Sequence, residues 1–229
     1  ETNIEKGLFE DMSEANQTLL KDTLRRYRDE VTVSKKGAKQ ETYKINKLMR
    51  NKICNYSLAR LTPNKIAKLR NELSLSSAPA TVNKYLTLIS VAVNTAKNEW
   101  GVHLPLNPCA KIKRMEEPEP KDIRVQPEEE ELLLKYAERS KKHWLKAIII
   151  VALELGCRRG ELFRLSKTDV DFFKFTAVLR NTKNGSDRRI GISPKAVEAL
   201  QALIPSIDGR FFPTDSEQFK FYWKQLKRW

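Results

Sequence analysis

Histidine and cysteine are scarce in this sequence, and their scarcity excludes several kinds of site. The chain has 229 residues but only two histidines and three cysteines. The cysteines, at positions 54, 109 and 157, lie far apart and form no Cys-x-x-Cys pair, so neither a zinc pattern nor a disulfide framework is present. His103 and His143 also lack the spacing of a metal-binding pair. We therefore expect no metal site and a cytoplasmic, reducing environment.

Long apolar runs are missing as well. No stretch reaches the roughly 18 consecutive apolar residues of a membrane-spanning helix, and no signal peptide is evident. The chain opens on Glu1 rather than on Met, which is typical of a processed or partial chain. Hydrophobic residues still make up 40% of the sequence, enough for packed cores in one large domain or two small ones.

Acidic residues are the minority, and the excess positive charge is uneven. Lysine and arginine number 43 against 29 aspartates and glutamates, for a net charge of +14. Residues 1–115 hold 21 basic and 11 acidic residues, a net of +10, whereas residues 116–229 hold 22 and 18, a net of +4. A solubilising surface is the simplest interpretation. The concentration of charge in the first half instead favours a polyanionic partner.

The first half carries the periodicity of four helices. After an acidic linker tail at residues 1–12, the apolar stripes predict helices at Glu14–Glu30, at Lys39–Ile53, from Thr62-Pro63 onward, and at Val82–Trp100. Gly101 ends the last one. Residues 13–110 are therefore predicted to form a small helical domain.

The second half alternates helices with a hairpin. The Pro-containing, polar segment 111–126 is the expected linker, and residues 127–229 the second domain. Helices are predicted at Glu128–Ser140, His143–Leu155, Ser193–Leu203 and from an Asp215 cap to Trp229, with strands at Ala177–Leu179 and Arg189–Ile192. The fold class expected is mainly α with a small antiparallel β-sheet.

One stretch concentrates the chemistry. Gly156 ends an apolar helix, Cys-Arg-Arg-Gly-Glu-Leu follows at 157–162, and the hairpin turn Thr-Lys-Asn-Gly occupies 182–185. Arg158 is suited to bind phosphate oxygens because its planar, permanently charged fork can donate two hydrogen bonds to them. Lys183 is suited to give up a proton, as arginine is not.

This stretch resembles the first half of the catalytic domain of tyrosine recombinases, the phage integrase family. The resemblance implies that Arg158 clamps the scissile phosphate, that Glu161 buttresses the site, and that Lys183 protonates the leaving oxygen. The upstream helices resemble that family's SAM-like core-binding domain. Departures from the common pattern are Leu155, Lys167 and Gly191, where Thr, Trp and Pro are frequent. None of these three is a reacting group.

The family completes its site with a His-x-x-Arg pair, a further His or Trp, and a nucleophilic Tyr. No histidine follows His143 here, so we expect the chain to stop before those groups and to be inactive alone. Tyr222 lies in an aromatic helix segment that is typical of a core, not of a nucleophile. The resemblance also implies duplex DNA as partner, a tetramer on DNA, and chemistry that uses no cofactor.

Predicted DNA contacts fall into two groups. Charge and polarity select Lys35, Lys36, Lys39, Lys47, Thr81, Asn83 and Lys84 in the first half, and Arg159 and Arg188 in the second. Arg189 could also contact phosphate, and for all three arginines an ordinary solvated charge is an equal alternative. Two functions follow from these patterns: a site-specific recombinase, or a noncatalytic DNA-binding remnant or regulator. The residues encoded after Trp229 would discriminate between them.

Overall fold

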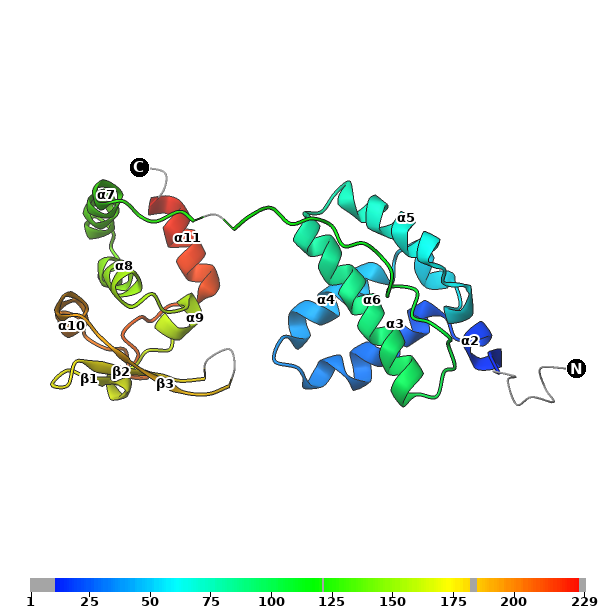
Figure 1. Ribbon diagram of the computed structural model, residues 1–229. Helices are drawn as coiled ribbons and strands as arrows, with labels where there is room; N and C mark the ends of the chain where they lie inside the picture. Colours follow the sequence, from blue (N-terminus) through cyan, green and yellow to red (C-terminus); the bar gives the residue numbers. More distant parts are fainter. Residues whose placement is uncertain (1–10, 121, 182–184, 227–229) are drawn as a thin grey trace, which may run out of the picture. The chain divides into compact units, whose positions relative to one another are not determined.

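The chain divides into two compact units, residues 1–120 and 121–229. The computed structural model describes residues 11–120, 122–181 and 185–226 (Figure 1). It is mostly helical, with one three-stranded antiparallel sheet in the second unit, which confirms the predicted fold class. The division falls inside the segment 111–126 that was expected as a linker, and the detailed domain limits stay a prediction.

The first unit is a helical domain built around one long helix. α6 (Pro79–Glu99) packs against α3 (Leu20–Glu30), α4 (Ala38–Leu48) and α5 (Pro63–Ser74) (Figure 1). The shorter elements are α2 (Ser13–Gln17) and the 3-10 turns η1 (Thr32–Ser34), η2 (Lys52–Asn55) and η3 (Leu58–Arg60). Its core contains the fully buried side chains of Leu20, Leu24, Ile45, Ile66, Leu86 and Ile89. Burial of this apolar face is the main stabilising contribution.

The predicted helix Glu14–Glu30 is wrong in one respect, because it is broken in the middle. Thr18 and Leu19 adopt extended backbone between α2 and α3. Leu19 forms an isolated β-bridge with Ser57, and the Leu58 N–H donates to the Thr18 carbonyl at 2.9 Å. Hydrogen bonds to a distant segment thus replace those of the helix, which an apolar stripe alone cannot indicate.

The predicted helix Lys39–Ile53 is too long. α4 ends at Leu48, and the side chain of Asn51 then accepts a hydrogen bond from the Ile53 N–H at 2.9 Å, which starts η2. Asparagine favours such local caps over a helix interior. The start of α5 is as predicted, with Thr62 as cap and Pro63 in the first turn. Gly101 follows α6 with φ of +77°.

The second unit places three helices and the sheet around a central helix. α8 (Trp144–Leu155) packs against α7 (Pro127–Glu138), α9 (Arg159–Leu162) and α10 (Pro194–Gln201) (Figure 1). α11 (Ser216–Leu226) also contacts α7, and the 3-10 turn η4 (Lys167–Asp169) leads into the sheet. The Asp215 carboxylate caps α11 as predicted, by accepting from the backbone N–H of residues 217 and 218. The predicted end of this helix at Trp229 lies outside the described residues.

The sheet has the strand order β1-β2-β3, and each neighbouring pair is antiparallel. Its strands are β1 (Val170–Asp171), β2 (Thr176–Leu179) and β3 (Arg188–Gly191). β1 is too short to show periodicity and was not predicted. In the register of β2 with β3, Leu179 lies opposite Arg188 and Val178 lies opposite Arg189. Within the described parts of the chain, no helix is long and apolar enough to cross a membrane.

Candidate functional site

The site begins where α8 ends. Gly156 takes the left-handed conformation, with φ of +54°, and caps α8 as predicted. Arg158 is then extended and stands directly before the short helix α9. Its backbone N–H donates to Glu161 Oε2 at 2.9 Å, and its Nη1 donates to Glu161 Oε1 at 3.0 Å. The Glu161 side chain is only 2% exposed, whereas that of Arg158 is 54% exposed. The buried Glu161 therefore holds Arg158 in place, while about half of the Arg158 side chain stays exposed.

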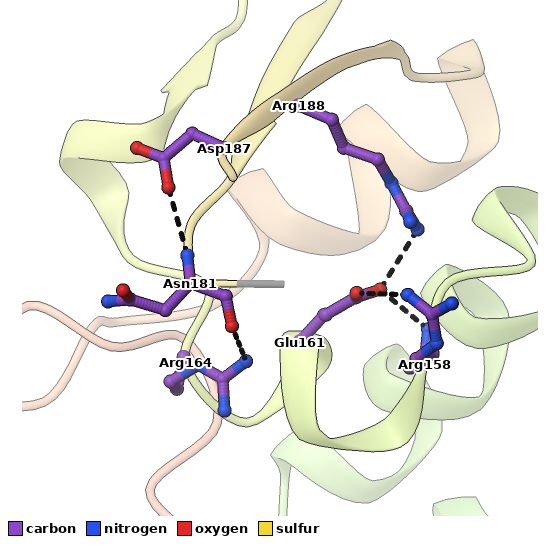
Figure 2. A network of polar contacts seen from close by, with 6 residues as sticks. All are labelled: Arg158, Glu161, Arg164, Asn181, Asp187 and Arg188. Carbon is purple, nitrogen blue, oxygen red and sulfur yellow. Dashed lines mark hydrogen bonds and ion pairs between the residues drawn. The ribbon is translucent and has the colours of Figure 1, made fainter. Parts of the chain in front are cut away.

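A second arginine reaches the same carboxylate. Arg188, at the start of β3, donates from Nη2 to Glu161 Oε2 at 3.0 Å, and its side chain is 41% exposed. Figure 2 shows Arg158 and Arg188 approaching Glu161 from two sides. One buried negative charge is thus paired with two half-exposed positive charges. The cluster keeps a net positive charge at the surface, as an anion-binding site requires.

The electrostatics of Glu161 follow from these contacts. Burial raises the pKa of the carboxyl, but the hydrogen bonds from the backbone and side chain of Arg158 and the charge of Arg188 outweigh it. The net effect is a pKa below the usual value for glutamate. Glu161 is therefore ionised at neutral pH and remains a fixed acceptor for both guanidinium groups.

The base of the hairpin is held by a second set of contacts. Asn181 has φ of +49°, its N–H donates to Asp187 Oδ1 at 2.9 Å, and its carbonyl accepts from Arg164 Nη2 at 3.2 Å (Figure 2). These bonds link β2 and β3 to each other and to the end of α9. Lys183, the predicted proton donor, lies outside the described residues. Its role stays a prediction.

A buried aspartate connects the turn η4 with the end of β2. Asp169, 8% exposed, accepts hydrogen bonds from Ser166 Oγ at 2.6 Å and Arg180 Nε at 2.5 Å. Burial raises the pKa of Asp169, but its contacts with Ser166 and Arg180 lower it below the usual value. The contact joins η4 to the residue that follows β2. The Ser166–Asp169 part of this contact is a capping box whose Ser-x-x-Asp spacing is visible in the sequence. The contacts of Arg180, Arg164 and Asn181 join residues without such a local motif, and the sequence did not indicate them.

Two other predicted residues have protein partners. Arg159 Nη2 donates to Ser216 Oγ at 2.7 Å, so this arginine connects α9 with the start of α11. Tyr222 is half-buried in α11, with its ring packed edge to face on Trp144 at a centroid distance of 5.7 Å. This environment is that of a packing residue, in keeping with the interpretation given to Tyr222 above.

The predicted lysines of the first unit fall into two classes. Lys36, Lys39 and Lys47 are exposed. Lys35 instead donates from Nζ to Tyr27 Oη and to Glu41 Oε1, both at 2.6 Å. Partial burial lowers the pKa of Lys35, but these two partners outweigh it and raise the pKa above the usual value. Lys35 is thus held by other side chains of the unit. The other three lysines are exposed, Lys39 and Lys47 in α4 and Lys36 just before it.

The residues of α6 that were predicted to contact DNA also differ in whether they are exposed or bound by other parts of the protein. Lys84 is exposed and lines a hollow of about 250 Å³, and Thr81 is half-buried. The side-chain amide of Asn83 is hydrogen-bonded to residues of the segment 111–126. It donates to the Met115 carbonyl at 2.9 Å and to Glu117 Oε1 at 2.8 Å, and it accepts from the Met115 N–H at 2.8 Å. A DNA contact by Asn83 stays a prediction, and it would require these bonds to open.

The sequence and the fold were compared with known proteins. Residues 124–221 match the model of the phage integrase family. A shufflon-specific DNA recombinase of Escherichia coli is 30% identical over 213 residues, which make up 90% of this chain and 55% of that protein. The chain therefore spans little more than half the length of this relative.

Two solved structures have a similar fold. A lambda integrase dimer bound to a COC′ core site has a TM-score of 0.75 at 20% identity, with 99% of this chain and 70% of that chain covered. The Tn1549 transposon integrase in complex with circular intermediate DNA has a TM-score of 0.73 at 17% identity, with 91% and 77% covered. At these identities the likeness establishes the fold alone.

Proposed function

Because this chain belongs to the phage integrase family of tyrosine recombinases, we propose that it acts in site-specific DNA recombination. The observation that carries this proposal is the half-exposed Arg158, fixed by the buried carboxylate of Glu161. Recombination requires a DNA phosphodiester to be held, attacked and rejoined. A guanidinium presented in this way is suited to the first of these tasks.

In this proposal Arg158 binds the nonbridging oxygens of the scissile phosphate. Its two contacts with Glu161 come from the backbone N–H and from Nη1, so the remaining guanidinium donors are available to an anion. Negative charge grows on the phosphate oxygens in the transition state, and a donor already aimed at them lowers the barrier without reorganisation. Glu161 is the positioning residue for this donor. Lys183 is proposed to protonate the departing 5′ oxygen.

The first unit is proposed to bind the duplex around the cleavage site. Lys36, Lys39 and Lys47 supply exposed positive charge, and Lys84 and Thr81 lie at the N-terminal end of α6. Lysines that neutralise phosphates release counterions, which gives affinity on any sequence. Base recognition, if it comes from α6, requires the polar side chains at its start to enter a groove.

The nucleophile is proposed to be a tyrosine other than Tyr222, outside this sequence. Tyr222 packs on Trp144, and Lys142 Nζ lies 5.5 Å from the centroid of its ring. The 229-residue chain alone is therefore proposed to bind DNA without cutting it. The whole protein is proposed to cut and rejoin DNA through a 3′-phosphotyrosine, and to assemble on DNA as a multimer.

Recombination of a reporter by the whole protein tests this function. The reporter carries two copies of the recombination site, mapped beforehand from sequenced junctions, and product is counted after expression of the wild type and of Arg158→Ala. Arg139→Ala is the matched control, since it removes the same charge from an exposed position in the same unit. We expect loss of at least about 10²-fold with Arg158→Ala and little change with the control. Binding without any recombination by the wild type would indicate a noncatalytic remnant instead.

A further inference from the structure

The two arginines at Glu161 do not have the same relation to its carboxylate. Arg158 engages both oxygens, with its backbone on Oε2 and its side chain on Oε1. Arg188 contacts Oε2 alone, through Nη2 at 3.0 Å. It belongs to the strand β3, not to α9. The contact of Arg188 is therefore not needed to hold the geometry of α9. The contact instead changes the net charge around Glu161.

Glu161 presents a difficulty for a phosphate clamp. A carboxylate about 3 Å from a guanidinium attracts it strongly, and this attraction opposes that of an incoming phosphate for the same charge. Arg158 and Glu161 taken alone are neutral as a pair. Because Glu161 is 2% exposed, water screens its charge little. Arg188 is the only other cation paired with Glu161 among the described residues, and it returns the cluster to a net positive charge.

We propose that Arg188 is a positioning residue that acts through Glu161. It neutralises the buttressing carboxylate, so that the charge of Arg158 stays available to the scissile phosphate. This inference rests on the proposed function, in which Arg158 binds that phosphate. It assigns to Arg188 a role in the charge balance of the site, with no requirement that its own side chain contact DNA.

The neighbouring residue shows that the arrangement depends on strand register. Arg189 follows Arg188 in β3 and is exposed, but no carboxylate of the described residues pairs with it. Successive side chains of a strand point to opposite faces. Only the residue opposite Leu179 therefore reaches Glu161. The chain thus contains a natural control, a second arginine of equal charge that is one position away and has no contact with Glu161.

Strand cleavage by the whole protein separates the two arginines. A nicked duplex with the mapped recombination site traps the covalent adduct, and its rate of formation is measured at saturating DNA together with the apparent Kd. We expect Arg188→Gln to slow adduct formation by about tenfold or more and Arg189→Gln by less than about twofold. Both variants lose one charge, so their Kd values should rise by similar factors. Arg188→Lys should recover part of the rate because it keeps the charge.

A second background distinguishes action through Glu161 from direct contact with DNA. In Glu161→Gln there is no carboxylate charge to neutralise. Adding Arg188→Gln to this variant should therefore slow adduct formation by a much smaller factor than Arg188→Gln slows it in the wild type. The double variant should also form the adduct faster than Arg188→Gln alone. Equal costs in both backgrounds would overturn the inference, as would equal slowing by Arg188→Gln and Arg189→Gln. If Arg188→Gln proves unstable in thermal melting, Arg188→Met, which also removes the charge, takes its place in both comparisons. Absence of an adduct from the wild type would refute the proposed function instead.

Discussion

Arg188 donates a hydrogen bond to the buried carboxylate of Glu161 at 3.0 Å, across 27 positions of sequence. The contact joins the strand β3 to the helical turn that presents Arg158. Both ends of the hairpin are anchored in this region, since Asn181 is bound by Arg164. The electrostatics of the proposed phosphate-binding Arg158 therefore depend on the sheet as well as on the residues next to it.

The ionised state of Glu161 should be visible in the pH dependence of stability. Glu161→Gln should lower the free energy of unfolding at pH 7 by about 1–2 kcal/mol, because charge-assisted hydrogen bonds to both arginines are weakened. The pKa of Glu161 is lowered in the folded protein from its ordinary value of 4.5. Its contribution is thus fully present above about pH 4.5 and is lost as the pH falls through the folded-state pKa.

Urea titrations between pH 7 and pH 3 measure this effect. The difference between wild type and Glu161→Gln should shrink below pH 4.5, the ordinary value for this group. Glu198→Gln, an exposed change on α10, is the control and should show a small, constant difference. A gap between wild type and Glu161→Gln that stays constant to pH 3 would show that Glu161 is not ionised in the way described.

Limited trypsin digestion should distinguish two parts of the segment 111–126. Lys113 and Arg114 lie in a stretch fastened to the first unit, through Arg70 and Asn83. We expect the first cut to follow Arg124, because a held backbone fits a protease poorly. In Asn83→Ala, trypsin should also cut after Lys113 and Arg114. First cleavage inside α6 would contradict the division into two units.

Salt should weaken DNA binding by the 229-residue chain steeply. The logarithm of the affinity is expected to fall linearly with the logarithm of salt concentration, and reversing Lys36, Lys39 and Lys47 should reduce the slope by up to about 3. Lys35→Gln should mainly lower the melting temperature, because Lys35 is bound to Tyr27 and Glu41. Affinity that is constant between low and moderate salt would rule out the electrostatic account.

The start of α6 is the predicted source of any base recognition. Thr81→Ala and Lys84→Ala should each reduce affinity for the cognate site more than for random duplex, by about 1–3 kcal/mol if a base contact is lost. Competition binding with the two duplexes measures the ratio. Equal losses on both would mean that these side chains only position the protein on the backbone.

Features governed by local chemistry could be predicted from the sequence. The apolar face of α6, the left-handed Gly156 and the Asp215 cap each depend on residues within one or two helical turns. The spacing of Arg158 and Glu161 likewise places them within one turn of helix, where an ion pair can form.

Features that depend on distant pairing could not. The break at Thr18 arises from hydrogen bonds with the segment around Ser57. The choice of Arg188 over Arg189 as partner of Glu161 follows from strand register, and a shift by one residue would exchange their faces. Asn83 looked like a free polar residue, yet its amide binds Met115, which is 32 residues away.

Covalent trapping tests the central claim most directly. The whole protein, the same protein with Arg158→Ala, and the 229-residue chain are each incubated with the nicked site and resolved under denaturing conditions. We predict a 3′-phosphotyrosyl adduct with the wild type, a rate at least about 10²-fold lower with Arg158→Ala, and no adduct with the 229-residue chain. Undiminished adduct formation by Arg158→Ala, or an adduct formed by the 229-residue chain and abolished by Tyr222→Phe, would contradict the account.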